Sequence, residues 1–448
     1  MLEKINAYLT PAMVIALLAA GLYLSFGTRF FQFRRLGQAL RATVGSLFTH
    51  GRRKEAKDGI TPFQAVSTAL AGTLGTGNIV GVATAIVSGG PGAIFWMIVS
   101  AFFGMIIKYA EVLLAVEYQI KDQNGSLRGG PMYYIKNGLH MPKLAALFAV
   151  VCLLASFGVG NMVQSHSVSD ALHSAFGLSK PLVGLVVAVI VSFAAFSGIK
   201  SIAKICEKLV PFMALFYLGA CLFVISANAQ KLPQALSLIV TSAFHFRAAG
   251  SGILGYTVAN AIRFGVTRGI FTNEAGLGSA PIAHGSAEAE SPAKQGLWGI
   301  FEVFFDTVVM CTLTTLVILT SGLWDSGLNG AALTTAAFSS VTGQFAAGFI
   351  AISIFFFAIS SILGWYCYGS SCLSYLSSGK KLLRLYQALF FLAVIAGSVI
   401  RLPFVWAISD TLNLLMFLPN MTAVLLLSKT VFRRTKEWEQ TKNKHHDP

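Results

Sequence analysis

The segment that decides the fold is Ala71-Gly72-Thr73-Leu74-Gly75-Thr76-Gly77-Asn78, which lies in the middle of a long apolar stretch. Residues 62–70 before it and 79–87 after it each resemble half of a membrane-spanning helix. Glycine weakens a helix by about 1 kcal/mol relative to alanine, so this glycine-rich segment predicts a break. Inside a bilayer, non-helical backbone is tolerated only where it is buried in protein or lines a cavity. We therefore expect a binding site here.

A broken helix presents two kinds of free backbone group at mid-membrane depth. Carbonyls at the end of the first half can hold a small cation, and N–H groups at the start of the second half can hold a carboxylate. We expect the cation at the carbonyls of Ala71, Gly72 and Leu74, and a substrate carboxylate at Gly75, Thr76, Gly77 and Asn78. This pairing is typical of a solute transporter. The alternatives are close helix packing through Gly77-x-x-x-Gly81 and, for Asn78, a helix N-cap.

Other classes of site fit the sequence less well. The dinucleotide-binding pattern requires glycine where Val80 stands, and the phosphate-binding loop requires lysine where Asn78 stands. The chain has no His-x-x-x-His or Gly-x-Ser-x-Gly motif, so we do not expect an enzyme or a cofactor other than a coupling ion. A channel would need a continuous polar pathway, whereas the chain offers two localised interruptions.

The composition predicts an all-α membrane protein. Hydrophobic residues make up 55% of the 448 residues and charged residues only 11%, well below the roughly 25% charge of a soluble domain. The net charge of +15 reflects Lys and Arg in loops on one side of the bilayer, so no nucleic-acid partner is expected. This distribution predicts a multi-pass protein of the plasma (inner) membrane with an outside N-terminus and a cytoplasmic C-terminus.

The apolar runs predict about eleven transmembrane helices. They are expected at about 11–26, 61–87, 93–118, 144–172, 181–197, 202–226, 250–283, 297–319, 345–368, 382–400 and 404–427. The chain then divides into an N-terminal helix with a basic cytoplasmic loop (1–59), a first repeat (60–228), an external interfacial segment (229–249), a second repeat (250–430) and a cytoplasmic tail (431–448).

The two repeats share one feature, an interrupted first helix. The span at 250–283 contains seven glycines, Gly250, Gly252, Gly255, Gly265, Gly269, Gly276 and Gly278. Interrupted helices at corresponding positions of two halves indicate an inverted repeat with the binding site at its interface. Because each half has five spans, the halves must cross the membrane in opposite orientations. The predicted architecture is one extra helix followed by a 5+5 core with broken helices two and seven.

Three motifs resemble those of the alanine or glycine:cation symporter family. They are Gly75-Thr76-Gly77-Asn78-Ile79, Gly129-Gly130-Pro131-Met132-Tyr133-Tyr134 and Asn273-Glu274-Ala275-Gly276-Leu277-Gly278-Ser279-Ala280. The resemblance implies a LeuT-like core preceded by one extra helix, in agreement with the count of spans. It also implies uptake of small neutral amino acids, chiefly alanine and glycine with serine as a further candidate, driven by Na⁺ or in some members by H⁺.

The resemblance adds residues to the expected site. It favours Gln164, on a polar stripe of the fourth span, as a substrate ligand, and it matches Phe271 and Trp365, which would cap the methyl side of a small substrate. Ser360 and Ser361 offer hard oxygen ligands for Na⁺, and Ser361 also for the substrate; the alternative for each is a bond to its own helix. Five ionisable residues lie near membrane depth, and we assign none of them to coupling: Lys108, Glu111, Glu274, Glu302 and Asp306.

Overall fold

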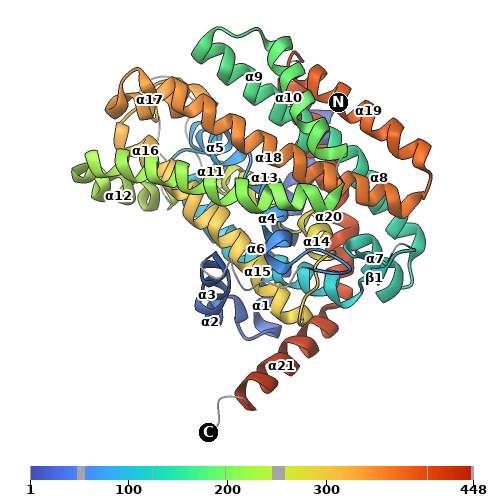
Figure 1. The fold of residues 1–448 in the computed structure, drawn as a ribbon. Coiled ribbons are helices and arrows are strands. Elements are labelled where there is room, and N and C mark those ends of the chain that lie inside the picture. Colours follow the sequence, from blue (N-terminus) through green and yellow to red (C-terminus); the bar gives the residue numbers. More distant parts are fainter. Residues whose placement is uncertain are drawn as a thin grey trace.

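The structure, a computed structural model, describes residues 2–47, 56–123, 125–196, 198–244, 258–400 and 402–444. These residues form helices joined by short connections, with one two-stranded antiparallel hairpin (Figure 1). Gly250, Gly252 and Gly255 of the predicted seventh span lie outside the described residues. So do residues 245–249 of the predicted interfacial segment.

The elements of the first half follow the predicted spans closely. They are α1 (Leu2–Gly27), α2 (Phe31–Arg34), α3 (Leu36–Leu47), α4 (Pro62–Thr73), α5 (Val80–Gly89), α6 (Gly92–Glu117), β1 (Ile120–Lys121), β2 (Leu127–Arg128), α7 (Pro131–Gly138), α8 (Pro142–Phe157), α9 (Val163–Phe176), α10 (Lys180–Phe196) and α11 (Ile199–Ala227).

The elements of the second half include three helices that the hydropathy pattern did not predict as spans. In order they are α12 (Leu232–Phe244), α13 (Val258–Asn273), α14 (Ala280–His284), α15 (Pro292–Val303), α16 (Thr312–Ser321), α17 (Gly330–Thr342), α18 (Phe345–Leu376), α19 (Lys380–Gly397), α20 (Leu402–Leu426) and α21 (Ser428–Lys444). The three are α12, α17 and α21. Residues 230–247 were expected to hold a short helix, and α12 lies there, packed against α6.

The first predicted break is present between α4 and α5. Thr61 begins α4 with a capping box, in which its hydroxyl accepts from the Gln64 backbone N–H and the Gln64 side chain accepts from the Thr61 backbone N–H. The helix ends at Thr73, and a single 3₁₀ turn, Thr76–Asn78, precedes α5. The last carbonyls of α4 therefore have no partners in a following helical turn.

The second break separates α13 from α14 and has a different local cause. Glu274, Gly276 and Gly278 have φ angles of 54°, 86° and 77°, in the left-handed region that an α-helix does not use. These positive φ angles, at every second residue, prevent the helix from continuing. Helix α14 begins after six intervening residues, at Ala280, with a proline, Pro281, in its first turn.

Two other spans are continuous but contain wide turns. The helix formed by α8 and α9 has a π-helical turn at Gly158–Met162, and the helix formed by α15 and α16 has a longer one at Phe304–Cys311. Such turns often occur at functional sites. From their apolar runs, both spans were expected to be regular helices.

The helices pack as two groups with α4 between them. In one group, α13 and α15 run along α6, and α5 packs on α13. In the other, α18 packs on α8 and α9, and α10 packs on α19. Helix α4 contacts α18 of the second group and α14 of the first, so the break after Thr73 lies where the groups meet (Figure 1).

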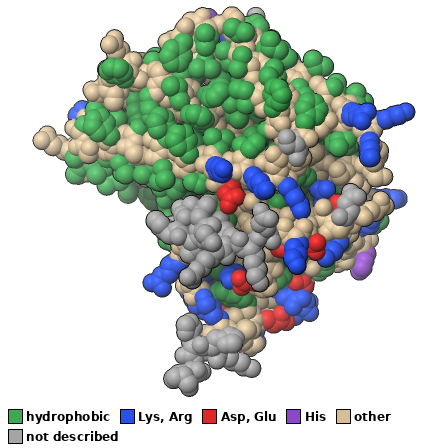
Figure 2. Space-filling model, viewed as in Figure 1, with side chains coloured by type: hydrophobic (Ala, Val, Ile, Leu, Met, Phe, Trp, Pro, Cys, Tyr) green, Lys and Arg blue, Asp and Glu red, His purple; other side chains and the backbone are tan. Residues whose placement is uncertain are grey.

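The surface is consistent with a protein embedded in a bilayer. Within the described residues, seven helical stretches are long and apolar enough to cross a membrane: Tyr8–Gly27, Gly92–Glu117, Pro142–Phe176, Ile199–Ala227, Pro292–Ser321, Phe345–Leu376 and Val405–Leu426. Two shorter apolar helices, α5 and α10, accompany them. Hydrophobic side chains cover a broad area of the molecule in Figure 2. The total of eleven spans stays a prediction.

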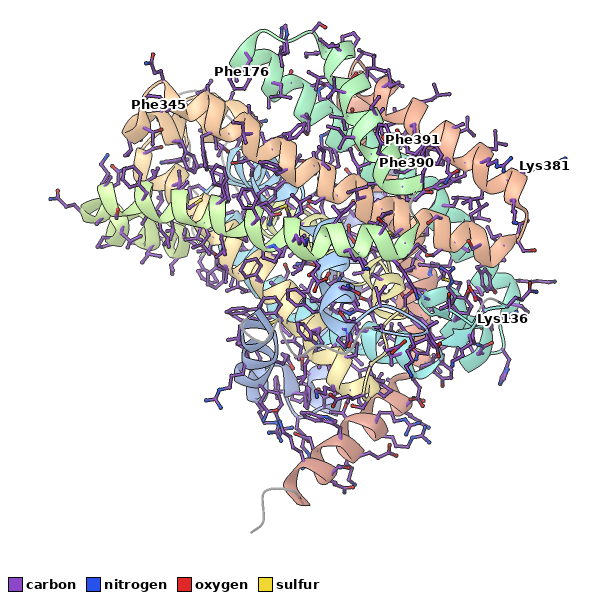
Figure 3. All side chains as sticks on the ribbon, viewed as in Figure 1. Lys136, Phe176, Phe345, Lys381, Phe390 and Phe391 are labelled. Atoms are coloured by element: carbon purple, nitrogen blue, oxygen red, sulfur yellow. The ribbon has the colours of Figure 1, made fainter. Side chains whose placement is uncertain are left out.

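Basic side chains gather at one end of the helices, which we call the basic face. Lys121, Arg128 and Lys136 line one surface cavity there, and Lys200 shares a neighbouring cavity with Arg128. In Figure 3, Lys136 and Lys381 lie on this side, away from Phe345 at the start of α18. Figure 2 shows the same separation between the apolar surface and the Lys and Arg side chains.

Candidate functional site

The break after α4 brings its backbone into contact with two other helices. The side-chain oxygen of Gln164, on α9, accepts a hydrogen bond of 3.1 Å from the backbone N–H of Thr76. The Gln164 amide nitrogen donates to the carbonyl of Val159, 3.2 Å away, at the start of the π-helical turn. Gln164 thus occupies the N–H group at which a substrate carboxylate was expected. Its side-chain oxygen would compete with the carboxylate for this N–H group, whereas its amide nitrogen could donate a hydrogen bond to the carboxylate.

Ser360 and Ser361 have different surroundings although they are neighbours on α18. The Ser361 hydroxyl donates to the carbonyl of Gly72 across the helix interface, with an O–O distance of 3.0 Å. The Ser360 hydroxyl donates to the carbonyl of Phe357 in its own helix, at 2.8 Å. The structure therefore places Ser361 at the break, while Ser360 makes the within-helix bond that was its alternative interpretation.

Gly75 marks the point where these groups converge. A Cβ atom at position 75 would lie 3.1 Å from the Gln164 side-chain oxygen and 3.2 Å from the Ser361 hydroxyl. The backbones of α4 and α18 also approach closely one turn away, since a Cβ at Gly364 would be 2.7 Å from the backbone nitrogen of Gly72. Glycine at these positions therefore permits the close approach of α4, α9 and α18 at this junction.

Phe271 and Trp365 make their ring contacts with different partners. Phe271 is next to the break, because a Cβ at Gly77 would lie 3.4 Å from its ring. Its ring centroid is 4.5 Å from that of Trp406, and both residues line a cavity of about 470 Å³. Trp365 instead packs edge-on against Tyr368, with centroids 5.5 Å apart. Their shared role in capping a substrate stays a prediction.

A polar chain that the sequence analysis did not predict connects the two breaks. Asn78 donates to a carboxylate oxygen of Asp306 at 2.8 Å. The other Asp306 oxygen accepts from the Thr307 hydroxyl at 2.8 Å, and that hydroxyl accepts from the Asn273 amide at 3.0 Å. Asn78 adjoins the first break and Asn273 the second. The sequence signal was the pair Glu302 and Asp306, four residues apart, which had no assigned role.

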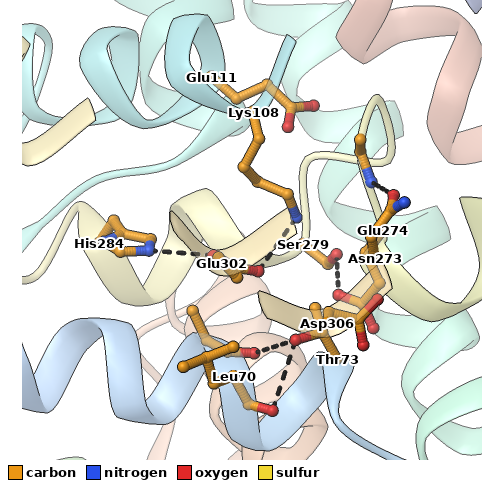
Figure 4. Close-up of polar contacts among 12 residues, drawn as sticks. Leu70, Thr73, Lys108, Glu111, Asn273, Glu274, Ser279, His284, Glu302 and Asp306 are labelled. Carbon is orange, nitrogen blue, oxygen red and sulfur yellow. Dashed lines mark hydrogen bonds and ion pairs between the residues drawn. The ribbon is translucent and has the colours of Figure 1, made fainter. Parts of the chain in front are cut away.

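Lys108, Glu302 and His284 form a buried cluster of ionisable side chains (Figure 4). One Glu302 oxygen lies 3.3 Å from the Lys108 ammonium and the other 3.3 Å from Nε2 of His284. The Gln295 amide is 2.9 Å from Nδ1 of His284. If this amide donates, the imidazole proton is on Nε2 and points at Glu302. One lysine then balances one glutamate.

Glu111, Glu274 and Asp306 are buried but form no ion pair within the described residues. Their partners are neutral: Asn420 donates to Glu111, Ser279 and Trp365 donate to Glu274, and Asn78 donates to Asp306. A carboxylate away from water is costly unless it is neutralised by a proton or a cation. These three groups therefore give the core the capacity to take up positive charge.

Two sets of oxygen atoms could hold a cation. Of the carbonyls expected as ligands at the end of α4, those of Ala71, Gly72 and Leu74, the Gly72 carbonyl lies 3.0 Å from the Ser361 hydroxyl. Near the 3₁₀ turn, the Asn78 side-chain oxygen is buried without a hydrogen-bond partner, and the Asp306 carboxylate lies beside the same amide. Hard oxygen ligands of this kind suit alkali cations better than transition metals.

A polytopic helical bundle with a helix broken at its centre, small residues at the break and buried oxygen ligands beside it defines a secondary transporter. The chain belongs to the sodium:alanine symporter family, whose sequence model matches residues 1–448. Its members are amino-acid:cation symporters and not enzymes.

Individual relatives agree with this assignment. The chain is 42% identical to the sodium/alanine symporter AgcS of Methanococcus maripaludis over 449 residues, covering 98% of this chain and 97% of that protein. It is 42% identical to the "probable sodium/glutamine symporter GlnT" of Bacillus subtilis over 438 residues, covering 97% and 89%.

The fold also has a solved counterpart. The crystal structure of MhsT in complex with L-phenylalanine superposes with a TM-score of 0.60, covering 84% of this chain and 90% of that one at 12% sequence identity. The chain therefore has the predicted LeuT-like fold.

Proposed function

We propose that the protein takes up small neutral amino acids, alanine and glycine foremost and serine as a further candidate, by symport with Na⁺. The observation that carries the proposal is the convergence of Gln164 and Ser361 on Gly75 at the break. The junction joins a backbone N–H group for a carboxylate to carbonyls for a cation within one turn. The relatives' names support the same reaction class but differ in the amino acid.

The small size of the substrate is inferred from how tightly the junction is packed. A single methyl group at Gly75 would already press on Gln164 and Ser361, and one at Gly77 would lie 2.8 Å from a Thr272 methyl carbon. Because one added methyl group on the protein would already force neighbouring atoms to move, the junction favours a substrate with a small side chain.

Proton coupling is the second candidate, and a specific observation supports it. Glu111, Glu274 and Asp306 are buried without an ion-pair partner in the described part of the chain. Intramembrane carboxylates of this kind serve as proton relays in many transporters. Na⁺ is favoured because the carbonyl ligands beside Ser361 are at the break itself.

The proposed location is the inner membrane with the basic face in the cytoplasm. Lys and Arg are enriched in cytoplasmic loops, and the basic face carries Lys121, Arg128, Lys136 and Lys200. Helix α1 is followed by Arg29, Arg34 and Arg35, so its first residues would lie outside and α21 would lie in the cytoplasm.

Uptake of radiolabelled alanine into proteoliposomes tests the proposal. Gradients of Na⁺, K⁺ and H⁺ are imposed one at a time, with the other ions equal on both sides. We expect saturable accumulation only with inward Na⁺, inhibited by unlabelled glycine and serine. Accumulation with inward H⁺ in Na⁺-free buffer would favour the second candidate. Flux that does not saturate would instead indicate a channel.

A further inference from the structure

Trp365 is held on three sides. Its indole N–H donates to a carboxylate oxygen of Glu274 at 2.9 Å, and its ring meets Tyr368 edge-on. On the third side, any Cβ at Gly160 would overlap the indole ring, so the ring requires glycine at that point of the π-helical turn. The side chain is fully buried. Its orientation is therefore set by its neighbours and leaves little freedom to rotate.

Glu274 is an unusual partner for an indole. It follows the last residue of α13 with a φ angle of 54°, which non-glycine residues seldom adopt. Its second oxygen accepts from the Ser279 hydroxyl, across the loop that follows (Figure 4). The backbone turn and the Ser279 bond together aim the carboxylate at α18. A hydrogen bond to an ionised acceptor is stronger than one between neutral groups.

Trp365 lies on the side of the candidate site that faces the basic face. It is one helical turn beyond Ser361, in the direction of the basic residues Lys380 and Lys381 that follow α18. Gly160 similarly lies one turn before Gln164 on the helix formed by α8 and α9, whose first residues follow α7 at the basic face. Trp365 and Gly160, which lie against each other, are thus one helical turn nearer the basic face than Ser361 and Gln164.

Phe271 lies on the opposite side of Gln164 and Ser361. It precedes Glu274 by one turn on α13, which runs from its start at Val258 toward the break. Phe271 lines the cavity of about 470 Å³ that also contains Arg263, Arg268 and Asp410. The two aromatic residues therefore lie on opposite sides of the level of Gln164 and Ser361 along the helices.

We propose that Glu274 is a positioning residue that holds Trp365 as the closure of the site toward the basic face. The bond joins the α6–α13–α15 group to the α8–α9–α18 group, so the closure persists while the groups stay together and opens when they separate. In this role Glu274 sets the upper size of the substrate and blocks its release. This inference rests on the proposed function for the identity of the substrate.

Site-directed thiol labelling tests the closure without requiring transport. Ser361→Cys places a thiol at the junction. The six native cysteines are all buried, so the protein without this substitution measures the background labelling. A membrane-impermeant maleimide is applied to membrane vesicles of each orientation. Glu274→Ala, Glu274→Gln and Trp365→Phe are made in this background. The glutamine keeps an acceptor for the indole and loses only the charge, and the phenylalanine keeps a ring and loses only the donor.

Glu111→Gln is the matched control. Glu111 is also a buried carboxylate, and it reaches the same loop through Asn420, which donates both to Glu111 and to the carbonyl of Gly276 at 2.8 Å. It does not touch Trp365 through any described hydrogen bond. A change that merely loosens the loop should therefore affect this variant as well.

We expect Glu274→Ala and Trp365→Phe to raise the labelling rate from the basic face about tenfold, the factor for one lost buried hydrogen bond whose other partner is left unsatisfied. Glu274→Gln and Glu111→Gln should label like the parent, and the Ala/Phe double variant should label no faster than either single variant. In proteins with Ser361 intact, leucine should compete with alanine in Glu274→Ala and not in the parent protein.

Unchanged labelling in both Glu274→Ala and Trp365→Phe would overturn the closure, as would equal acceleration in Glu111→Gln. If Glu274→Ala does not fold, Trp365→Phe still decides the matter, because it keeps Glu274 and removes only the donor of the hydrogen bond. Absence of alanine uptake by the parent protein would count against the proposed function alone, because the labelling result does not depend on the transported molecule.

Discussion

Ser360 and Ser361 show how much a single helical step decides. The two hydroxyls are adjacent, yet a rotation of about 100° per residue turns Ser361 to the Gly72 carbonyl and leaves Ser360 bonded to its own helix. From sequence alone they were equal candidates for Na⁺. We now expect Ser361→Ala to raise the Na⁺ concentration for half-maximal uptake about tenfold or more, since a lost bond to a charged group is worth about 1.5–3 kcal/mol.

Ser360→Ala is the control for that measurement, because it removes the same atom one residue away. Its Na⁺ dependence should stay within about twofold of the parent, as expected for a residue outside the cation's reach. Equal shifts in both variants would mean that both hydroxyls bind Na⁺, as the sequence first indicated. No shift in either would place the cation elsewhere, with the Asn78 oxygen and Asp306 as the remaining ligands.

The contacts that sequence reasoning missed join residues far apart in the chain. Asn78 and Asp306 are 228 positions apart, and no local pattern links them. Glu274 and Trp365 are 91 positions apart. Glycine positions at the break, by contrast, were recognisable because glycine's effect on a helix is local. The parts of the candidate site that depend on local backbone conformation were thus predictable. The contacts between side chains that are distant in the sequence were not.

At the scale of elements, Gly75 and Gly81 give a matched pair for testing the broken helix. A Cβ at Gly75 would press on Gln164 and Ser361, whereas nothing lies within 4 Å of a Cβ at Gly81, inside α5. Gly75→Ala should displace the Gln164 side chain from the Thr76 N–H and reduce alanine uptake at least tenfold, a loss of about 1.4 kcal/mol. Membrane insertion should be unaffected.

Gly81→Ala should keep parental uptake and raise thermal stability slightly, since alanine favours a helix by about 1 kcal/mol. Uptake and the melting temperature of the purified protein measure both effects. Parental transport by Gly75→Ala would place the substrate away from this break. Loss of transport in Gly81→Ala would show instead that any change near the break is harmful.

The elements themselves were predictable to different degrees. Long apolar runs such as those of α6 and α18 predict membrane helices from their composition alone. Helix α21 is mostly polar and was expected only as a tail. It is held by the Arg434–Glu117 ion pair at 2.7 Å and by the Thr435 hydroxyl, 2.8 Å from the hydroxyl of Tyr109. Such contacts exist only after folding, so hydropathy carries no sign of them.

At the scale of the whole molecule, the two helix groups meet around the α4 break through few hydrogen bonds. Two of them tie the α8–α9–α18 group to the break itself, Ser361 to the Gly72 carbonyl and Gln164 to the Thr76 N–H, and a third, Trp365 to Glu274, joins the two groups directly. Alternating access by rocking one group against the other would have to break these bonds. Because all three surround the candidate site, a bound substrate and cation can bias the same movement.

The last prediction concerns the charge that this movement carries. A neutral amino acid is a zwitterion with no net charge, so one accompanying Na⁺ moves one positive charge across the membrane. An inside-negative potential of 100 mV then supplies about 2.3 kcal/mol, enough for roughly fifty-fold accumulation at about 1.36 kcal/mol per decade. We expect a potassium–valinomycin potential to accelerate alanine uptake into proteoliposomes. Exchange of labelled for unlabelled alanine at equal Na⁺ is the control, because it moves no net charge and should respond far less. An uptake rate indifferent to the potential would contradict one-to-one coupling with a cation of either kind.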